Sequence, residues 1–254
     1  YIENDKIEFR SAEDLWGKGV DECTMILHQR HLGSEVLLIG PAGENLVKFA
    51  NIRTHRTSSM GRTGGGAVMG SKNLKGIVIK GTKGVKIYDP NKFLELSLQC
   101  QKDLMDPNFG MVHSLTYKIM SKYGTPGITR LIGQTGMVPI KNWNQCGIWA
   151  QDGELVEYIG DKIWKRNDAC YTCPVHCHGA YRLEDPVYGC FSGGPEYETT
   201  CALGHKCLEP RSKLVLKLNA MCNDLGMDTV EAGNLFATLM EWFEKGIIDE
   251  KFTE

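Results

Sequence analysis

The spacing of apolar residues changes at Asp89-Pro90, and this change limits the folds that the 254-residue chain can adopt. Before it, Glu35–Gly40 and Gly76–Lys80 are short apolar runs, each closed by a glycine, which is typical of strands. After it, apolar residues recur at helical spacing. We therefore expect an α+β fold, with a β-rich portion over residues 1–87 followed by a mainly helical domain over residues 88–254.

Weaker patterns predict further elements. The segment Asn45–Ile52 alternates loosely and predicts another strand, and Ala12–His31 predicts a helix ahead of the strands. In the second portion the expected helices begin at Asn91 and cover Val112–Tyr123 and Ile128–Ile132.

The last two helices carry the clearest end signals. Ser212 is expected to cap a helix that stops at Gly226. Asp228 is then expected to cap a second helix, with Glu231 completing a pattern like a capping box and Gly246 following its last turn.

Composition excludes several classes of protein. The 29 Lys and Arg residues nearly balance the 31 Asp and Glu residues, which argues against nucleic acid as the main partner. No apolar run approaches the roughly 20 residues that a membrane-spanning helix needs. No secretory pattern opens the chain, so we expect a cytoplasmic protein. Because the sequence starts without Met, we expect it to be a fragment of a longer polypeptide.

Ten cysteines are many for this length, and three of them form the pattern Cys170-x-x-Cys173-x-x-x-Cys177. Thiolates at this spacing are typical of an iron–sulfur cluster. A zinc site, with His176 and His178 beside Cys177, and a set of simple buried thiols are the alternatives. A [4Fe–4S] cluster needs a fourth thiolate. The candidates are Cys190, Cys201, Cys207 or a cysteine beyond residue 254.

A second motif is rich in glycine: residues 61–70 contain five glycines, with Arg62 among them and Lys72 and Lys75 close behind. Such backbone can approach an anion closely, so a phosphate-bearing ligand is expected. The order Gly70-Ser71-Lys72 does not match a Walker A loop, and Met69 occupies the third glycine position of a dinucleotide fingerprint. The alternative is a plain turn between strands.

These two motifs, taken with four other segments, resemble the aldehyde ferredoxin oxidoreductase family of tungsten enzymes. The matching segments follow the family's order, and they are Ile39–Asn45, residues 61–75, Gly124-Thr-Pro-Gly127, Cys170–Cys177, Gly194-Pro-Glu-Tyr-Glu198 and Cys222–Asp228. No Glu-x-x-His appears, so nothing indicates the subunit-bridging iron of some archaeal members.

The resemblance implies a tungsten (or molybdenum) ion held by two pyranopterins on a β-rich base domain, which helical domains cover. It implies a [4Fe–4S] cluster on Cys170, Cys173 and Cys177, with the fourth ligand in a later domain. It also implies two pterin-contacting segments. The first consists of Arg62, Thr63, Gly64 and Gly65; the second contains Asn223, Gly226, Met227 and Asp228, and departs from the family's Asp-x-x-Gly-Leu-Asp pattern at Asn223 and Met227.

The resemblance leaves two substrate classes open. Most members oxidise aldehydes and pass electrons to ferredoxin. The tungsten subunit of class II benzoyl-coenzyme A reductases instead reduces the ring of an aryl-CoA thioester, with electrons from an iron–sulfur subunit. The resemblance also implies an oligomer or a multisubunit complex. A zinc-stabilised interaction domain is the non-enzymatic alternative.

Proton transfer near the metal needs groups such as Glu and His, and Glu196 and His205 are the predicted catalytic pair. On one continuous helix they would face opposite ways, so we expect a break at Gly204 or a Glu196 that precedes the helix. Glu198 is the rival, and an exposed Glu with a core His is the structural alternative. Reduction of an aromatic ring needs a proton donor, and a His can donate a proton near neutral pH because its unperturbed pKa is about 6.5. His205 therefore favours the aryl-CoA branch.

Overall fold

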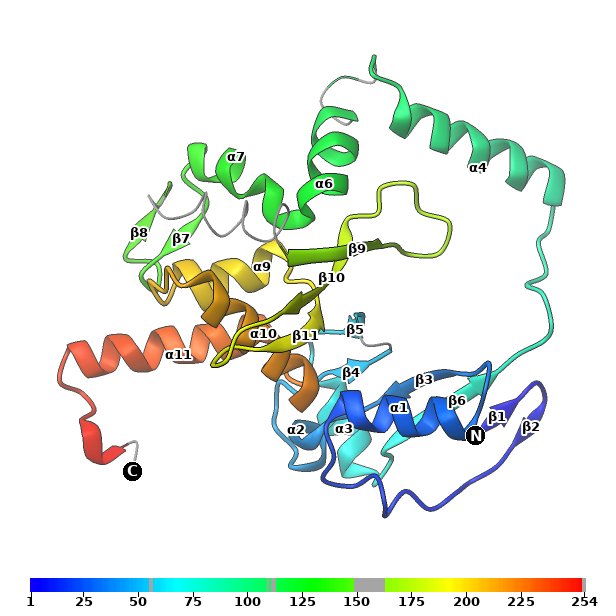
Figure 1. The fold of residues 1–254 in the computed structure, drawn as a ribbon, viewed down its shortest axis with the longest axis horizontal. Helices are drawn as coiled ribbons and strands as arrows, with labels where there is room; N and C mark the ends of the chain where they lie inside the picture. Colours follow the sequence, from blue (N-terminus) through cyan, green and yellow to red (C-terminus); the bar gives the residue numbers. More distant parts are fainter. Residues whose placement is uncertain (55–56, 109, 111–112, 149–162, 253–254) are drawn as a thin grey trace.

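The computed structural model describes residues 1–254 apart from 55–56, 109, 111–112, 149–162 and 253–254. A six-stranded sheet forms from residues before position 81, and helices with two smaller sheets follow (Figure 1). The predicted α+β fold is confirmed.

The base sheet has the strand order β2-β1-β6-β3-β4-β5. The predicted strands at Glu35–Gly40 and Gly76–Lys80 are its central antiparallel pair, β3 and β6. Helix α1 packs on this pair, and Val20, Cys23 and Leu27 bury themselves against Val36 and Leu38. The elements of this portion are β1 Ile2–Glu3, β2 Lys6–Ile7, α1 Val20–Arg30, β3 Glu35–Leu38, α2 Pro41–Glu44, β4 Ile52–Arg53, β5 Ser59–Met60, α3 Gly65–Ser71 and β6 Gly76–Lys80.

Two predictions for this portion were wrong. The helix expected over Ala12–His31 begins only at Val20, because Gly17 has a left-handed φ of +82° and interrupts it. The segment Asn45–Ile52 is mostly not a strand. Its backbone groups bond locally, as when Val47 N donates to Ala42 O at 2.9 Å, so only Ile52 reaches the sheet.

The second portion is mainly helical, and its expected helices are present, although Val112 lies outside the described residues. Helix α4 lies at the periphery, where none of its residues is buried (Figure 1). No helix in the described ranges has both the length and the apolarity needed to span a membrane. The helices are α4 Pro90–Met105, π-helix η1 His113–Met120, α6 Ser121–Tyr123, η2 Thr125–Ile128, α7 Thr129–Gln134, α9 Tyr197–Thr200, π-helix η4 Cys201–His205, α10 Ser212–Leu225, α11 Thr229–Glu244 and η5 Glu250–Phe252.

This portion also contains an antiparallel sheet, β11-β10-β9, that was not predicted. Tyr181 on β10 is fully buried against Leu203 and Leu216, and its hydroxyl donates to Leu216 O at 2.6 Å. The strands are β9 Trp164–Asp168, β10 His178–Leu183 and β11 Cys190–Gly193, and a separate hairpin pairs β7 Pro139–Ile140 with β8 Gln145–Cys146.

The expected ends of the last two helices are largely confirmed. Gly226 ends α10 with a φ of +75°, and Asp228 caps α11 by accepting a hydrogen bond from Val230 N at 2.9 Å. Gly246 follows α11 with a φ of +67°. The prediction for Ser212 was wrong, because Ser212 is the first helical residue and makes no capping bond.

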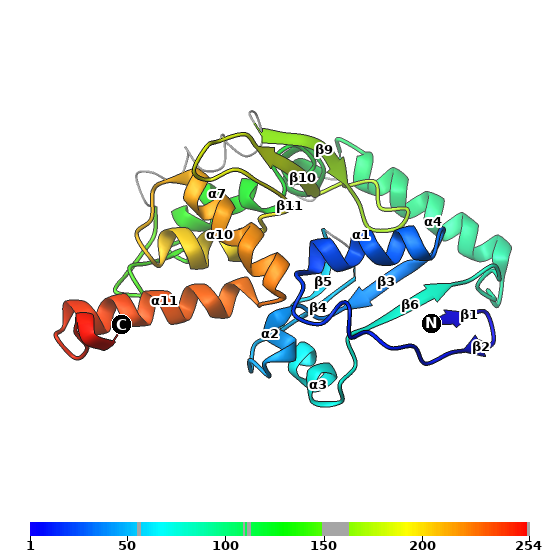
Figure 2. The same ribbon diagram turned by 60° about the horizontal axis from the view of Figure 1, so that its bottom comes forward.

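The α10–α11 junction joins the two portions. Asn51 N donates to Gly226 O at 2.8 Å, and Asp228 N donates to Phe49 O at 3.0 Å. Both views show this junction beside α2 and β4 (Figures 1 and 2). The second predicted pterin segment therefore lies against the base sheet.

Candidate functional site

The glycine-rich segment forms a sharp turn that leads into α3, between β5 and β6. Thr63 and Gly64 both have left-handed backbone, with φ of +77° and +75°. A Cβ on Gly64 would lie 2.3 Å from Lys48 O, so only glycine fits there. This turn exposes Arg62 and Thr63, whereas Gly64 is buried and Gly65 is partly buried.

Arg62 contacts Asp228, the last residue of the second predicted pterin segment. Its Nε lies 3.4 Å from Oδ2 of Asp228, and its Nη2 lies 3.5 Å from Oε2 of Glu231. Both distances exceed the 2.7–2.9 Å of a good charge-assisted hydrogen bond. The Arg62 side chain is 59% exposed. A loosely paired, exposed guanidinium beside glycine backbone fits the binding of a phosphate group.

Asn223, in contrast, belongs to a buried polar network. Its Oδ1 accepts a hydrogen bond from Nη1 of Arg53 at 2.9 Å, and its Nδ2 donates to Oγ of Ser192 at 2.9 Å. Burial lowers the pKa of Arg53 to about 10. The carbonyls of Gly226 and Met227 accept hydrogen bonds from Asn51. Sequence reasoning missed Arg53 and Asn51, although an arginine directly after the predicted strand Asn45–Ile52 was an available signal.

The three thiols of the cysteine loop differ in their exposure to solvent. Cys170 is exposed, and Cys173 and Cys177 are partly buried. Cys173 N donates to Cys170 O at 3.0 Å, which closes the first turn of the loop. Within the described residues, no three His, Cys, Asp or Glu side chains are arranged to hold a metal ion. Three thiols on one loop have the chemistry that an iron–sulfur cluster needs, so the cluster stays a prediction.

The cysteines considered as a fourth ligand inside the chain have structural surroundings. Cys207 Sγ donates to Ala202 O at 3.4 Å, and burial raises the pKa of this thiol to about 11. Cys190 likewise has a pKa raised by burial, and Cys201 is buried. These thiols therefore have the surroundings of small core side chains.

Glu196 immediately precedes α9, one of the two arrangements that the sequence predicted. Nδ1 of His178 lies 2.6 Å from its Oε1, and Oγ1 of Thr125 donates to its Oε2. Burial raises the pKa of the Glu196 carboxyl, but the hydrogen bonds from His178 and Thr125 lower it by more, so it lies below its usual value. Glu196 is thus an ionised carboxylate at neutral pH.

His205 occupies a different environment. Its ring is 1% exposed, at the end of π-helix η4, and its Nδ1 lies 3.1 Å from Thr200 O. The rival Glu198 is exposed. The partners found for Glu196 are instead His178 and Thr125, both of which sequence reasoning missed. Two features of the sequence could have identified them: His178 directly follows Cys177, and Thr125 belongs to the motif Gly124-Thr-Pro-Gly127.

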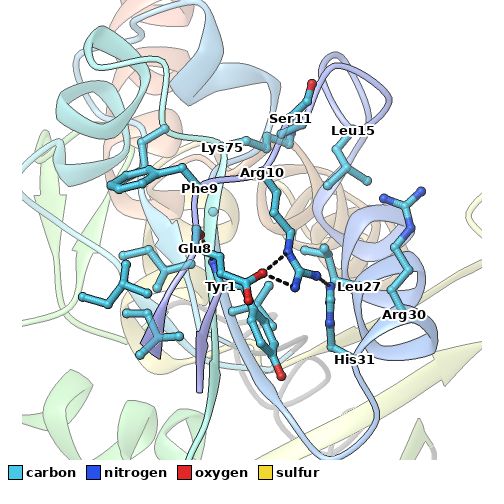
Figure 3. A pocket seen from close by; sticks show the side chains of 17 residues that line it. Tyr1, Glu8, Phe9, Arg10, Ser11, Leu15, Leu27, Arg30, His31 and Lys75 are labelled. Carbon is cyan, nitrogen blue, oxygen red and sulfur yellow. Dashed lines mark hydrogen bonds and ion pairs between the residues drawn. The ribbon is translucent and has the colours of Figure 1, made fainter. Parts of the chain in front are cut away.

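A separate cavity lies away from all of these residues. It measures about 610 Å³ and is enclosed by the β1–β2 hairpin, α1 and β6 (Figure 3). Arg10 crosses it, with its guanidinium 4.5 Å from the ring centroid of Tyr1 and in contact with Glu8 and His31. None of the predicted site residues lines this cavity.

Comparison with known proteins bears on both portions. A tungsten-containing aldehyde ferredoxin oxidoreductase from Pyrococcus furiosus is 40% identical over 99% of this chain, and one from Thermococcus kodakarensis is 38% identical over 98%. The WOR-like subunit of an aliphatic sulfonate oxidoreductase from P. furiosus is 30% identical over 99% of the chain. The chain spans 40%, 40% and 41% of these relatives' lengths, respectively.

A solved structure has a similar fold. It is described as the active site complex BamBC of benzoyl coenzyme A reductase in complex with 1,5-dienoyl-CoA, and it matches with a TM-score of 0.81. The identity is 26%, over 99% of this chain and 39% of that one. The family model for the N-terminal domain of aldehyde ferredoxin oxidoreductase matches residues 1–81, and that for domains 2 and 3 matches residues 110–254. With the second match alone covering more than half of its length, the chain belongs to the aldehyde ferredoxin oxidoreductase family.

Proposed function

We propose that this chain forms part of the active site of a tungsten–pterin oxidoreductase that oxidises aldehydes to carboxylic acids. One observation carries the proposal: Glu196 is an ionised carboxylate held on both oxygens. The oxidation of an aldehyde with water yields a carboxylic acid, two protons and two electrons, so it needs a proton acceptor. Glu196 takes that role. The tungsten-containing relatives at 36% to 40% identity support the substrate class.

The cofactor groups have candidate holders in this chain. Arg62 and the backbone of Thr63–Gly65 would bind a pterin phosphate, and Asn223, Gly226, Met227 and Asp228 would also contact the pterin. When bound, the pterin-held tungsten supplies the two-electron redox chemistry. Cys170, Cys173 and Cys177 would hold a [4Fe–4S] cluster.

The cluster would supply electron-transfer chemistry, and the electron partner would be a ferredoxin or an iron–sulfur subunit, within an oligomer or a multisubunit complex. We also propose that residues 1–87 act as the pterin-binding base and residues 88–254 as the helical domain that carries the cysteine loop. The similarity to a subunit complex supports an assembly of this kind.

Reduction of an aryl-CoA ring, predicted from His205, is the second candidate. The similarity to the benzoyl coenzyme A reductase complex favours it. The surroundings of His205 support it less well, because the ring is 1% exposed and its Nδ1 lies 3.1 Å from a backbone carbonyl.

An assay on the purified holoenzyme tests both candidates. Acetaldehyde and benzaldehyde are compared with benzoyl-coenzyme A and its cyclic diene product, using a viologen dye as the electron carrier. We expect turnover of the aldehydes, and turnover of the thioesters alone would overturn the proposal in favour of the second candidate. Metal analysis runs in parallel, and zinc without tungsten would support an interaction domain instead.

Two variants assign the proton acceptor. Glu196→Gln should lose aldehyde turnover by at least about a hundredfold, which is in the range that general-base catalysis contributes. Glu198→Gln, an exposed carboxyl two positions away, is the matched control and should keep turnover. Equal turnover in both variants would remove Glu196 from the mechanism.

A further inference from the structure

The sheet register brings Glu196 to the cysteine loop. Strands β10 and β11 pair antiparallel with Ala180 opposite Gly193, and Gly194 N then donates to Gly179 O at 3.0 Å. β11 ends at Gly193, and this last bond keeps the residues that follow Gly194 beside the start of β10, where His178 lies next to Cys177. The pairing of the two strands therefore brings the backbone of Glu196 near His178, and the two side chains complete the contact.

The two oxygens of the Glu196 carboxylate then have different partners. His178, directly after the third predicted cluster ligand, contacts Oε1 at 2.6 Å. Thr125 donates to Oε2 from the other side. Thr125 is itself anchored, because its Oγ1 accepts a hydrogen bond from Tyr197 N at 2.8 Å. A carboxylate held at both oxygens has little freedom to rotate.

The environment of the His178 ring indicates the direction of its hydrogen bond. Its Nε2 is buried and has no hydrogen-bond partner among the residues that the structure describes. An ionised carboxylate can only accept a hydrogen bond, so the 2.6 Å contact with Glu196 requires a proton on Nδ1. The proton therefore resides on Nδ1, where it is donated to Glu196.

We propose that His178 and Thr125 are positioning residues that fix the Glu196 carboxylate beside the cysteine loop. The inference rests on the proposed role of Glu196 and extends it by naming the groups that orient this base. It also assigns a purpose to the motif Gly124-Thr-Pro-Gly127, which delivers the Thr125 hydroxyl to Oε2. Three segments far apart in the sequence thus converge on one carboxylate.

Turnover measurements on the holoenzyme test this proposal. His178→Ala and Thr125→Val should each lower kcat by about tenfold to a hundredfold, the effect expected from a small misplacement of a reacting group. KM should change by less than about twofold, because neither residue is assigned to substrate binding. The conservative variants His178→Asn and Thr125→Ser keep a donor near the carboxylate and should recover most of kcat.

A structural readout accompanies the kinetics. In crystal structures of His178→Ala and Thr125→Val holoenzymes, the Glu196 carboxylate should leave its present orientation, while tungsten and iron contents stay at wild-type levels. His176→Asn, an exposed histidine on the same loop, is the matched control and should keep both the carboxylate position and kcat. An unmoved carboxylate with wild-type kcat in His178→Ala would overturn the proposal.

Two further outcomes keep the test decisive. If His178→Ala loses iron, its lower kcat no longer tests the proposal, and the test then rests on Thr125→Val, because Thr125 lies outside the cysteine loop. Wild-type kcat in Thr125→Val would then overturn the proposal. Glu196→Gln distinguishes a failure of the proposed role of Glu196 from a failure of the positioning role of His178 and Thr125. Full turnover there refutes the proposed function of Glu196, whereas a functional Glu196 that does not move in either positioning variant refutes only the inference about His178 and Thr125.

Discussion

Arg62 and Asp228 form an ion pair across the boundary between the two portions, with Nε 3.4 Å from Oδ2. Arg62 belongs to the glycine-rich turn, and Asp228 caps α11. The family resemblance implies pterin binding for both residues, on separate motifs, and folding brings these motifs together. Because Asp228 is nearly buried while Arg62 is 59% exposed, the arginine is the partner that can turn toward a ligand.

Substitution of Arg62 by Ala should therefore lower the tungsten and pterin content of the purified protein. The guanidinium is largely exposed and both of its ion pairs are long, so the free energy of unfolding should change by less than about 1 kcal/mol. Elemental analysis and pterin fluorescence measure the loss. Lys72→Ala, an exposed cation at the end of α3, should retain both cofactors. Full tungsten content in a folded Arg62→Ala protein would contradict the assignment.

Substitution of Cys173 by Ala should remove most of the iron, because a cluster that loses one thiolate ligand is no longer held at that iron. Iron analysis and the EPR signal of the reduced protein report the change. Cys100→Ala, at an exposed thiol on α4, is the control and should keep its iron. Four irons per chain with an unaltered spectrum in Cys173→Ala would exclude the cluster from this loop.

The elements that the sequence predicted correctly are those with a sustained period or a clear end signal. The apolar runs of β3 and β6 and the capped helix α11 are of this kind, and so is the end of α10 at Gly226. The sheet of β9, β10 and β11 escaped prediction because its strands are short and contain His178, Gly179 and Cys190 in place of alternating β-branched residues.

The sequence predicts individual candidate residues for the site, but it does not predict which of them come into contact. Local motifs identified Arg62, Asp228, Glu196 and the cysteine loop. The contact of Glu196 with His178 depends on the register between β10 and β11, and the one with Thr125 depends on how η2 packs beside α9. Such long-range relationships are decided by packing of the whole chain, and no short window of sequence contains them.

A buried ion pair inside the base portion should be essential for stability. Lys75 and Glu44 form this pair with side chains only 2% and 4% exposed, and Glu44 also accepts a hydrogen bond from Gly17 N at 2.8 Å. Lys75→Met leaves the Glu44 carboxylate buried without its cation, so it should destabilise the fold by roughly 3–5 kcal/mol in denaturant unfolding.

The double variant Lys75→Met/Glu44→Leu provides the control for that experiment. Removing both charges avoids a lone buried ion, so its loss of stability should be smaller than the sum of the losses from the two single variants. Losses that simply add would show that the two charges do not interact.

Asp185 should make the stability of the second portion depend on pH. It lies in the turn between β10 and β11, where Lys213 Nζ contacts its Oδ2 at 2.7 Å and the backbone N–H groups of Tyr188 and Val187 each donate to Oδ1 at 2.9 Å. The hydrogen bond from Lys213 and these two backbone bonds lower the pKa of the Asp185 carboxyl to about 2 from an ordinary 3.8. The folded state thus binds this proton less tightly than the unfolded state does. The resulting stabilisation is fully present above the unfolded pKa and disappears as the pH falls through the folded pKa.

Asp185→Asn should therefore lower the denaturant midpoint at pH 7, and its deficit relative to the wild type should shrink as the pH is lowered from about 4 toward about 2. Glu184→Gln, at the neighbouring exposed carboxyl, should show no such pH-dependent deficit. A deficit in Asp185→Asn that stays constant over this pH range would mean that the charge of Asp185 does not stabilise the turn.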